Sequence, residues 1–286
     1  MKALVTGAGG QLAREWIAAA PPGWEITGRS RAQLDIGDGA AVTRAVQATA
    51  PDLIVNAAAF TAVDRAQSEA DAAWRVNRDG AANVARAATA AGAKLVHIST
   101  DFVFDGASGR PYRPTDPTSP LGVYGASKLA GEQAVREAAP GALIVRTAWV
   151  YAGHGANFLL TMLRLMNAGK PVRVVADQVG TPTSAVSLAA GLWALSLKGA
   201  EGLYHCTDAG VASWYDFAQA IAEEAGAVGL APSGVEVTPI ATADYPTPAP
   251  RPPFSLLDKS TTWALLGAAS PHWRTALRNV LAGMKN

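Results

Sequence analysis

Residues 2–13 read KALVTGAGGQLA, and this stretch decides the fold. A short strand-like run leads directly into Gly7, Gly10 and Ala13, in the spacing G-x-x-G-x-x-A, and then into a helical segment. Small residues are needed there because the turn is tight and because a pyrophosphate must reach backbone N–H groups at a helix start. A glycine triplet also marks ordinary turns, but its position after a first strand predicts a dinucleotide site.

The same strand–helix alternation continues outward from this stretch. Strand-like runs begin at Lys2, Trp24, Leu53, Lys94, Ala142 and Pro171, with helices expected near 11–20, 39–50, 68–91, 123–138 and 156–168. Such alternation is typical of a parallel sheet covered by helices on both faces. We therefore predict an α/β fold with a six-stranded, doubly wound parallel sheet of the Rossmann type.

After about residue 177 the rhythm loosens and turn signals multiply. A helix is expected over 184–197, and a second opens at Ser213, where Asp216 completes a capping box. Residues 244–255, DYPTPAPRPPFS, hold too many prolines for a helix or a sheet interior and predict an extended surface loop. We expect residues 1–177 to form the dinucleotide-binding domain and residues 178–286 a smaller substrate-binding lobe, with part of 145–160 contributing to the cleft.

Composition excludes several classes of protein. A net charge of +1 with 16% charged residues gives no electrostatic footprint for nucleic acid or a membrane surface. A single cysteine, Cys206, and four scattered histidines predict neither a disulfide nor a metal cluster. No signal peptide or membrane span is evident, so we expect a soluble cytoplasmic protein acting on a small molecule.

The end of the second strand bears on the choice of dinucleotide. An NAD site usually has a carboxylate there for the ribose 2′-hydroxyl, but this chain has Arg29, Ser30 and Arg31. Two arginines can bind a 2′-phosphate, which favours NADPH over NADH, although they can also be solvated surface cations. Asp35 and Ile36, a few residues on, would border the adenine.

Tyr124 and Lys128, in SPLGVYGASKLAGE, lie four residues apart at the start of an alanine-rich helix. They therefore share one helix face, where the ammonium can sit beside both the phenol and the nicotinamide ribose. A nearby cation would stabilise the phenolate and make Tyr124 a usable general acid. The alternative is a solvated helix face, but Ser99 and Thr100 end the fourth strand at the edge where open α/β sheets bind ligands.

Seven segments in chain order resemble the extended short-chain dehydrogenase/reductases and, within them, the dTDP-4-dehydrorhamnose reductases: TGAGGQLA, VNAAAFTAVDRAQSE, STDFVFDG, VYGASKLAGE, RTAWVYAGHGANF, DQVGTPTSA and PRPPFSLLD. This resemblance implies hydride transfer from NADPH, or NADH, to the C4 ketone of dTDP-4-dehydro-6-deoxy-L-mannose, giving dTDP-L-rhamnose. It makes Tyr124 the proton donor, Lys128 the ribose-binding lysine and Thr100 the third catalytic residue.

The resemblance also assigns binding residues. For the cofactor it implies Gly7, Gly10, Gln11, Leu12, Asn56, Ala57, Ala58, Ala59, Thr61, Asn77 and Ser99, beside the catalytic pair. For the sugar nucleotide it implies Asp101, Phe102, Trp149, Arg251 and Ser255, with Arg251 on the diphosphate. Taken singly, Asn77 would be an ordinary polar helix position, Trp149 a core aromatic and Arg251 a solvated cation.

The chain departs from the family pattern at several positions. Ala13 replaces a common glycine, and Phe102 replaces a frequent tyrosine, which removes a phenol that could bind the sugar. Some relatives dimerise around magnesium held by glutamates; this chain keeps Glu15 but has Val186 at a second position and no carboxylate side chain in VLAGMKN. We expect no metal site, a solvated Glu15, and a monomer or weak homodimer.

Two other readings stay open from the sequence. The Tyr/Lys/Thr set also serves 4-epimerases and other 4-ketosugar reductases acting on nucleotide sugars. A catalytically silent regulatory homologue would keep the fold without turnover, although intact Thr100, Tyr124 and Lys128 argue against it.

Overall fold

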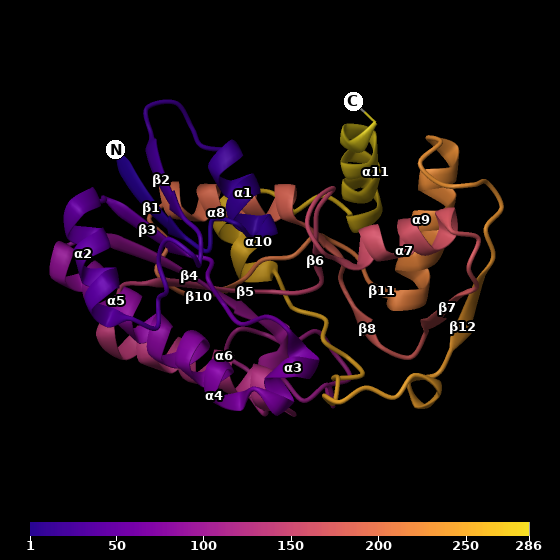
Figure 1. The fold of residues 1–286 in the computed structure, drawn as a ribbon, viewed down its shortest axis with the longest axis horizontal. Helices are drawn as coiled ribbons and strands as arrows, with labels where there is room; N and C mark the ends of the chain where they lie inside the picture. The colour runs from indigo at the N-terminus through magenta and orange to yellow at the C-terminus, as the bar shows by residue number, and fades with distance from the viewer. Residues whose placement is uncertain (286) are drawn as a thin grey trace.

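The computed structural model describes residues 1–285, and its centre is a six-stranded parallel sheet (Figure 1). The strands lie in the order β10-β5-β4-β3-β1-β2. Their bounds are β1 Lys2–Thr6, β2 Glu25–Arg29, β3 Leu53–Asn56, β4 Lys94–Thr100, β5 Leu143–Thr147 and β10 Gly202–His205. The predicted Rossmann-type α/β fold is confirmed.

Alternate strand residues supply the two halves of the core. Leu4 and Ile54 face one side, under the helices α2 Gly39–Thr49, α5 Ala81–Ala91 and α6 Val123–Ala138. Val5 and Val55 face the other side, under α1 Gln11–Ala18, α8 Ala185–Leu197 and α10 Ser260–Leu266. Figure 1 shows these two helical layers on opposite faces of the sheet. Burial on both faces explains why the strands read as continuous apolar runs.

The predicted sixth strand is wrong. The run from Pro171 does form a strand, β7 Val172–Val175, but it pairs with β12 Val237–Ile240 in a separate two-stranded sheet. The sixth place beside β5 is taken by β10. A valine-rich run specifies an extended conformation but not its partner, and the short β10 begins with a glycine that weakens its signal.

Residues 185–205 therefore pack with the first lobe, because α8 lies against α1 and β10 joins the main sheet. The division into residues 1–177 and 178–286 stays a prediction.

The second lobe has its own apolar core around Leu159, Phe217 and Leu277. Its helices are α7 Phe158–Asn167, α9 Trp214–Ala227 and α11 Trp273–Met284, and its short strands are β6 Val150–Tyr151, β8 Val179–Gly180, β9 Thr183–Ser184 and β11 Ala212–Ser213. The predicted capping box at the start of α9 is confirmed: the Asp216 backbone N–H donates to Ser213 Oγ (3.0 Å), and the Ser213 N–H donates to the Asp216 carboxylate (2.8 Å).

The single helix expected over 68–91 is divided. It consists of α4 Ala70–Trp74, a π-helical turn Arg75–Gly80, and α5, and it is preceded by a separate helix, α3 Val63–Ser68. The π turn lies in a confined position, because a side chain at Gly80 would overlap Ile36 and one at Gly131 of α6 would overlap the carbonyl oxygen of Asn77. Such a turn adds a residue to the helix without a sequence signal.

The segment 244–255 forms no helix or sheet apart from a short 3-10 turn at Thr242–Asp244, as predicted, but it is not wholly a surface loop. It crosses from β12 back to the first lobe beside α3 (Figure 1), and Ala249 and Ser255 are each 2% exposed. The prolines therefore stiffen a strap between the lobes. Among residues 1–285, no helix combines the length and apolarity that crossing a membrane would require.

Candidate active site

The strand order reverses between β1 and β3, so the turns that follow these strands meet at the carboxyl edge of the sheet. Gly7 has a φ of +71°, and a Cβ there would lie 2.7 Å from the backbone nitrogen of Ala58. Only glycine fits this contact. The Gly10 N–H donates to Gly7 O (2.9 Å), which closes the turn at the start of α1.

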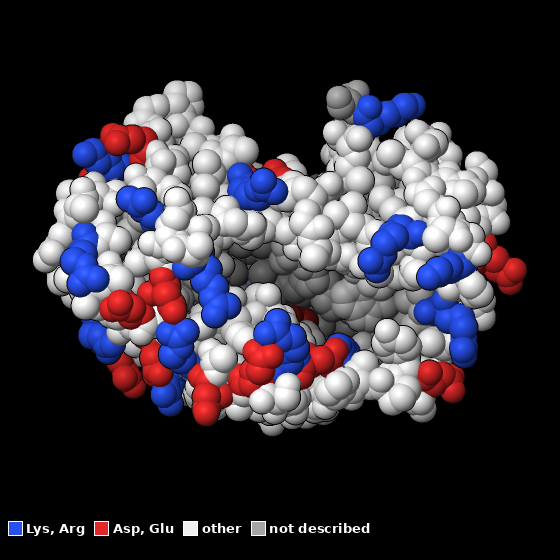
Figure 2. All heavy atoms as spheres, in the orientation of Figure 1, with Lys and Arg blue, Asp and Glu red and all other residues white. Residues whose placement is uncertain are grey.

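A cleft of about 620 Å³ opens in front of this turn, and Figure 2 shows the molecule hollowed between the two lobes. Most of the predicted site residues line it: Gly10, Gln11, Leu12, Ala57, Ala59, Thr61, Ser99, Thr100, Asp101, Phe102, Tyr124, Lys128, Trp149 and Arg251. The cleft thus brings together the glycine turn, the end of β4, one face of α6 and residues reached from the second lobe.

A second cavity of about 280 Å³ adjoins the cleft and shares Gly9, Gly10, Ala57, Ala59 and Thr61 with it. Gly7, Arg31, Asp35, Ile36 and Ala58 line this cavity. Arg31 is exposed, whereas Asp35 is bound by Arg75 (2.9 Å). A hydrogen bond from the Gly37 N–H, more than the arginine, lowers the pKa of Asp35. The two adjoining spaces suit an extended dinucleotide, with the exposed Arg31 in the cavity that Tyr124 does not line.

Arg29, Ser30, Asn56, Asn77 and Ser255 line neither cavity. Asn56 is buried, accepts from Thr6 (2.7 Å) and lies 3.1 Å from His97 Nδ1. Asn77, in the π turn, accepts from the Phe60 N–H (2.8 Å) and donates to Phe60 O (3.1 Å) and Ser127 Oγ (3.0 Å). It therefore fixes the loop after β3 against α6, which is a supporting position and not a lining one.

Tyr124 stands at the start of α6 with its half-buried phenol at the cleft. Burial raises the pKa of Tyr124 to about 12, and a hydrogen bond with Thr100 offsets part of that rise. The ring of Phe102 meets the ring of Tyr124 edge to face, with centroids 5.5 Å apart. The phenol is consequently protonated at neutral pH and held between Thr100 and Phe102.

The spacing of Tyr124 and Lys128 predicts that the ammonium stabilises the phenolate, but the structure gives Lys128 another partner. The Lys128 ammonium donates to the carbonyl oxygen of Ile98 (2.6 Å), and it is not among the groups that shift the pKa of Tyr124. Burial lowers the pKa of Lys128 itself to about 8, opposed by the Glu132 carboxylate. Both groups are desolvated at the cleft floor, and burial outweighs the expected stabilisation of the phenolate.

A buried ion pair lies beneath these residues. The Glu132 carboxylate, one helical turn after Lys128, accepts from Arg146 Nε (2.8 Å) and Nη2 (2.7 Å) and from Ser99 Oγ (2.5 Å). The side chains of Glu132 and Arg146 are 0% and 2% exposed. This network joins α6 to β4 and β5 directly under the cleft, and no pattern in the sequence predicted it.

Asp101 is buried at the other side of the cleft. Its Oδ1 accepts a hydrogen bond from Thr100 (3.0 Å), and its Oδ2 has no hydrogen-bond partner among residues 1–285. Burial raises the pKa of Asp101 to about 6, although the neighbouring hydroxyls of Ser255 and Thr100 counteract it. This oxygen is therefore a buried acceptor without a donor, in a residue that lines the cleft.

Arg251 lines the cleft but is not free. Its guanidinium binds the Asp64 carboxylate of α3 through two contacts of 3.1 Å and 2.9 Å and also donates to Ala249 O (3.1 Å). The hydrogen bond from Arg251 is the main cause of the lowered pKa of Asp64. The arginine thereby anchors the proline-rich strap to the first lobe.

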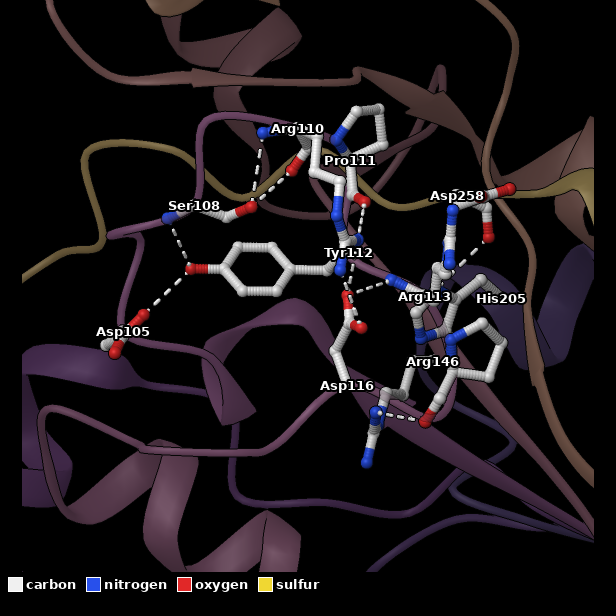
Figure 3. A network of polar contacts seen from close by, with 11 residues as sticks. Asp105, Ser108, Arg110, Pro111, Tyr112, Arg113, Asp116, Arg146, His205 and Asp258 are labelled. Atoms are coloured by element: carbon white, nitrogen blue, oxygen red, sulfur yellow. Dashed lines mark hydrogen bonds and ion pairs between the residues drawn. The ribbon is translucent and has the colours of Figure 1, made fainter.

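The segment after Arg251 is held by the loop that follows β4 (Figure 3). The Tyr112 hydroxyl donates a hydrogen bond to Asp105 (2.8 Å) and accepts one from the Ser108 N–H (3.1 Å). The Tyr112 backbone forms hydrogen bonds with the backbone of Leu256 and Asp258. The ring of Tyr112 stacks on Phe104 at 4.1 Å. These contacts fix the register of the segment that carries Ser255, whose hydroxyl lies near Asp101.

Trp149, which follows β5, and Trp214, the first residue of α9, both line the cleft, and Trp214 was not predicted from the sequence. Other lining residues that were not predicted are Gly9, Leu34, Phe60, Val63, Val76, Ile98, Thr147, Ala148, Val150, Gly155 and Ala156. Most are small or apolar, so that their residue type carries no ligand-binding signal. The sequence indicated only that Trp214 is the first residue after the helix cap Ser213, and not that it lines a ligand site.

Glu15 is not a solvated helix residue, contrary to expectation. It lies 2.7 Å from His154 Nε2, and Gln11 accepts from Asn157 (2.6 Å), so α1 is tied to the loop before α7. Val186 is 51% exposed. Within residues 1–285, no three side chains of His, Cys, Asp or Glu converge as a metal site would need.

Comparison with known proteins agrees with this geometry. The family model described as the RmlD substrate binding domain matches residues 1–286. The chain is 45% identical to a dTDP-4-dehydrorhamnose reductase of Mycobacterium tuberculosis strain H37Rv, over 99% of this chain and 93% of that protein. A crystal structure of a dTDP-4-dehydrorhamnose reductase from Clostridium acetobutylicum superposes with a TM-score of 0.94, at 38% identity and 100% coverage of both chains.

A second solved structure adds a ligand. The dTDP-4-dehydrorhamnose reductase of Bacillus anthracis, crystallised in complex with NADP, superposes with a TM-score of 0.93, at 36% identity and 99% coverage of both chains. The family model and these relatives span the sheet, the cleft and the second lobe together. This chain therefore belongs to the family of the RmlD substrate binding domain, among the extended short-chain dehydrogenase/reductases.

Proposed function

We propose that this protein reduces the C4 ketone of dTDP-4-dehydro-6-deoxy-L-mannose to give dTDP-L-rhamnose, with NADPH as the preferred reductant and NADH as a weaker one. The observation that carries the proposal is that Thr100, Tyr124 and Lys128 line the same cleft as the glycine turn after β1. The names of the relatives and the NADP in one of them support the same substrate class and cofactor.

The residues present fit a dinucleotide. The Gly7 turn leaves no room for a side chain, which is the close backbone approach that a pyrophosphate needs, and Arg31 stands exposed at the adjoining cavity for a 2′-phosphate. Lys128 at the cleft floor would bind the ribose hydroxyls. When bound, the cofactor supplies the hydride that the C4 carbon receives.

Tyr124 supplies the proton. As the C4 carbon gains the hydride, the electron pair of the C=O bond moves to oxygen, which takes the phenolic proton of Tyr124 and leaves a phenolate. A pKa of about 12 keeps the phenol fully protonated before the step and makes the phenolate a strong base that water reprotonates afterwards. The Thr100 hydroxyl, which lines the same cleft and donates to Asp101 in the structure (3.0 Å), would turn its proton to the carbonyl oxygen when the substrate binds.

The sugar nucleotide would lie between Asp101 and the second lobe. Asp101 lines the cleft, where its carboxylate can accept a hydrogen bond from a sugar hydroxyl, and Trp149 offers a flat apolar face. Arg251 would bind the diphosphate of the substrate. The diphosphate would have to compete with the Asp64 carboxylate for the Arg251 guanidinium. We propose that Asp101, Trp149 and Arg251 bind the substrate. We also propose that the protein is a monomer or a weak homodimer.

The test is oxidation of NADPH and of NADH with the dTDP-4-ketosugar generated in situ, followed by identification of the product. Tyr124→Phe should lower kcat by at least about 10²-fold, the lower range for one general acid. Tyr204→Phe, on the edge strand β10 and outside the cleft, is the matched control. Interconversion without net cofactor consumption would indicate an epimerase, and binding without turnover a silent homologue; either result would overturn the proposal.

A further inference from the structure

One wall of the cleft is a face-to-face pair of indoles, one following β5 of the first lobe and one in α9 of the second. The rings of Trp149 and Trp214 have centroids 3.6 Å apart and planes within 6° of parallel. Trp149 follows β5 by two residues, whereas Trp214 is the first residue of α9. Because both line the cleft, the stack joins the lobes at the site itself.

The backbone of Trp149 is strained. Its φ is +49°, in the left-handed region, which among residues 1–285 is shared by only one other non-glycine residue, Ala50. A bulky side chain adopts this conformation only where its surroundings impose it, and such residues cluster at ligand sites. Something in the structure must therefore hold Trp149 in place.

The contacts around the Trp149 ring identify what holds it. Trp214 covers one face, and Phe158 in turn packs on Trp214 with centroids 4.7 Å apart. Gly180 lies at the ring edge, where a Cβ would come within 2.8 Å of Cε2 and 2.9 Å of Cζ2. The Trp149 carbonyl accepts from the Thr183 N–H (3.1 Å), so the backbone is fixed as well.

The wall adjoins the reacting end of the cleft. Thr147, two residues before Trp149, pairs in register with Thr100, the hydroxyl beside the Tyr124 phenol. Because Trp149 and Tyr124 line the same cleft, a sugar with its ketone at Tyr124 would lie within reach of the Trp149 ring. Flat indole faces suit the apolar C–H face and methyl group of a 6-deoxysugar.

We propose that Trp214 and Gly180 are positioning residues that fix Trp149 as the sugar-facing wall of the cleft. The proposal rests on the proposed function, since it specifies how that sugar site is shaped. Trp214 packs on one face of the Trp149 ring. The absence of a side chain at Gly180 allows the edge of that ring to pack against the backbone there. Trp149 alone, with a φ of +49°, would relax away from the cleft.

Two variants perturb the ring from different sides. Trp214→Leu removes the stack, and Gly180→Ala pushes the ring edge from a position that does not line the cleft, although its Cβ would also meet Ser255 Oγ at 3.0 Å. Both should raise the KM for the ketosugar and the Kd for dTDP-L-rhamnose about tenfold or more, with the Kd for NADPH unchanged. Trp214→Phe keeps an aromatic face and should restore most of the affinity.

Trp263→Leu is the matched control, because Trp263 is also a half-buried tryptophan near a helix start but lies outside the cleft. Thermal unfolding of every variant checks that it folds. Binding of dTDP, which lacks the sugar, shows which part of the ligand the wall contacts. An unchanged Kd for dTDP in Trp214→Leu and Gly180→Ala supports a wall that faces the sugar. A tenfold weaker affinity for dTDP, equal to that for dTDP-L-rhamnose, would overturn the proposal.

The readouts also separate this proposal from the proposed function. If wild type fails to bind dTDP-L-rhamnose, the proposed function fails. If wild type binds it and folded Gly180→Ala and Trp214→Leu bind it equally well, the positioning role is refuted while the function stands.

Discussion

Breaking the buried pair of Glu132 and Arg146 should be one of the most damaging changes to the stability of this protein. The change we consider is Arg146→Met, which keeps an apolar stem but removes the guanidinium that binds Glu132 through two contacts of 2.8 Å and 2.7 Å. The remaining Glu132 carboxylate is 0% exposed, so it would be a charge without its main partner in a dry interior.

The magnitude follows from that burial. Removing one partner of a buried ion pair costs about 3–5 kcal/mol, since the other charge stays desolvated. At about 2 °C per kcal/mol, the lower end of the range for chains of comparable length, this is a fall in Tm of about 6–10 °C. Ser99 Oγ and the exposed Arg136 still donate to Glu132 and should keep the loss from exceeding that range.

The assay is urea unfolding followed by circular dichroism, with wild type, Arg146→Met, Glu132→Gln and the double variant Glu132→Leu/Arg146→Met. The double variant replaces both charges by apolar groups and should recover most of the loss, apart from about 1 kcal/mol for the Ser99 hydroxyl left without its acceptor. Glu137→Gln, an exposed position on the same helix, is the control.

Two outcomes would refute the reasoning. One is a single variant within about 1 kcal/mol of wild type, since no buried charge could then be uncompensated. The other is a double variant that is less stable than both single variants, which would mean that the pair itself, and not the burial of a lone charge, determines the cost.

Three further predictions concern the cleft. Gly125→Ala should destabilise the protein by at least about 2 kcal/mol and abolish turnover, because a Cβ there would overlap the Phe102 carbonyl oxygen and displace Tyr124; a folded, active variant in thermal unfolding and NADPH oxidation would contradict this. Burial raises the pKa of Asp101 from 3.8 to about 6, so the native state binds more protons than the unfolded state between those values and wild-type stability falls as pH rises through them. Asp101→Asn should lack that slope and gain up to about 2–3 kcal/mol over wild type at pH 8 but little at pH 4; a gain independent of pH would exclude Asp101 as its cause. Finally, the pKa of Lys128 is lowered to about 8, so NADPH binding that needs the ammonium should weaken about tenfold between pH 7 and pH 9, and the same slope in Lys128→Met would rule the lysine out.

Local rules predicted much of the fold and the centre of the site. The G-x-x-G-x-x-A turn, the end of β4 and the i, i+4 spacing of Tyr124 and Lys128 each fix a residue relative to its own element, and the carboxyl edge of a parallel sheet brings those elements together. That is why a few local patterns were enough to find the cleft.

What failed depended on partners distant in the sequence. The VRVV strand was paired with the wrong sheet because strand propensity does not choose a neighbour. Arg251 is bound by Asp64, 187 residues away, and Trp214 meets Trp149 from another lobe. The expected effect of Lys128 on Tyr124 failed because desolvation depends on packing that spacing alone does not reveal.

The position of β10 has a consequence for how the chain can be synthesised and cut. Until residue 205 has left the ribosome, β5 has no outer neighbour, and its row of unpaired N–H and C=O groups is open to any other extended chain. A fragment ending at residue 177, which the sequence predicts to be a dinucleotide-binding domain, would leave the edge of β5 unpaired. We expect it to aggregate, and a fragment would have to reach past His205 before its sheet is protected on that side.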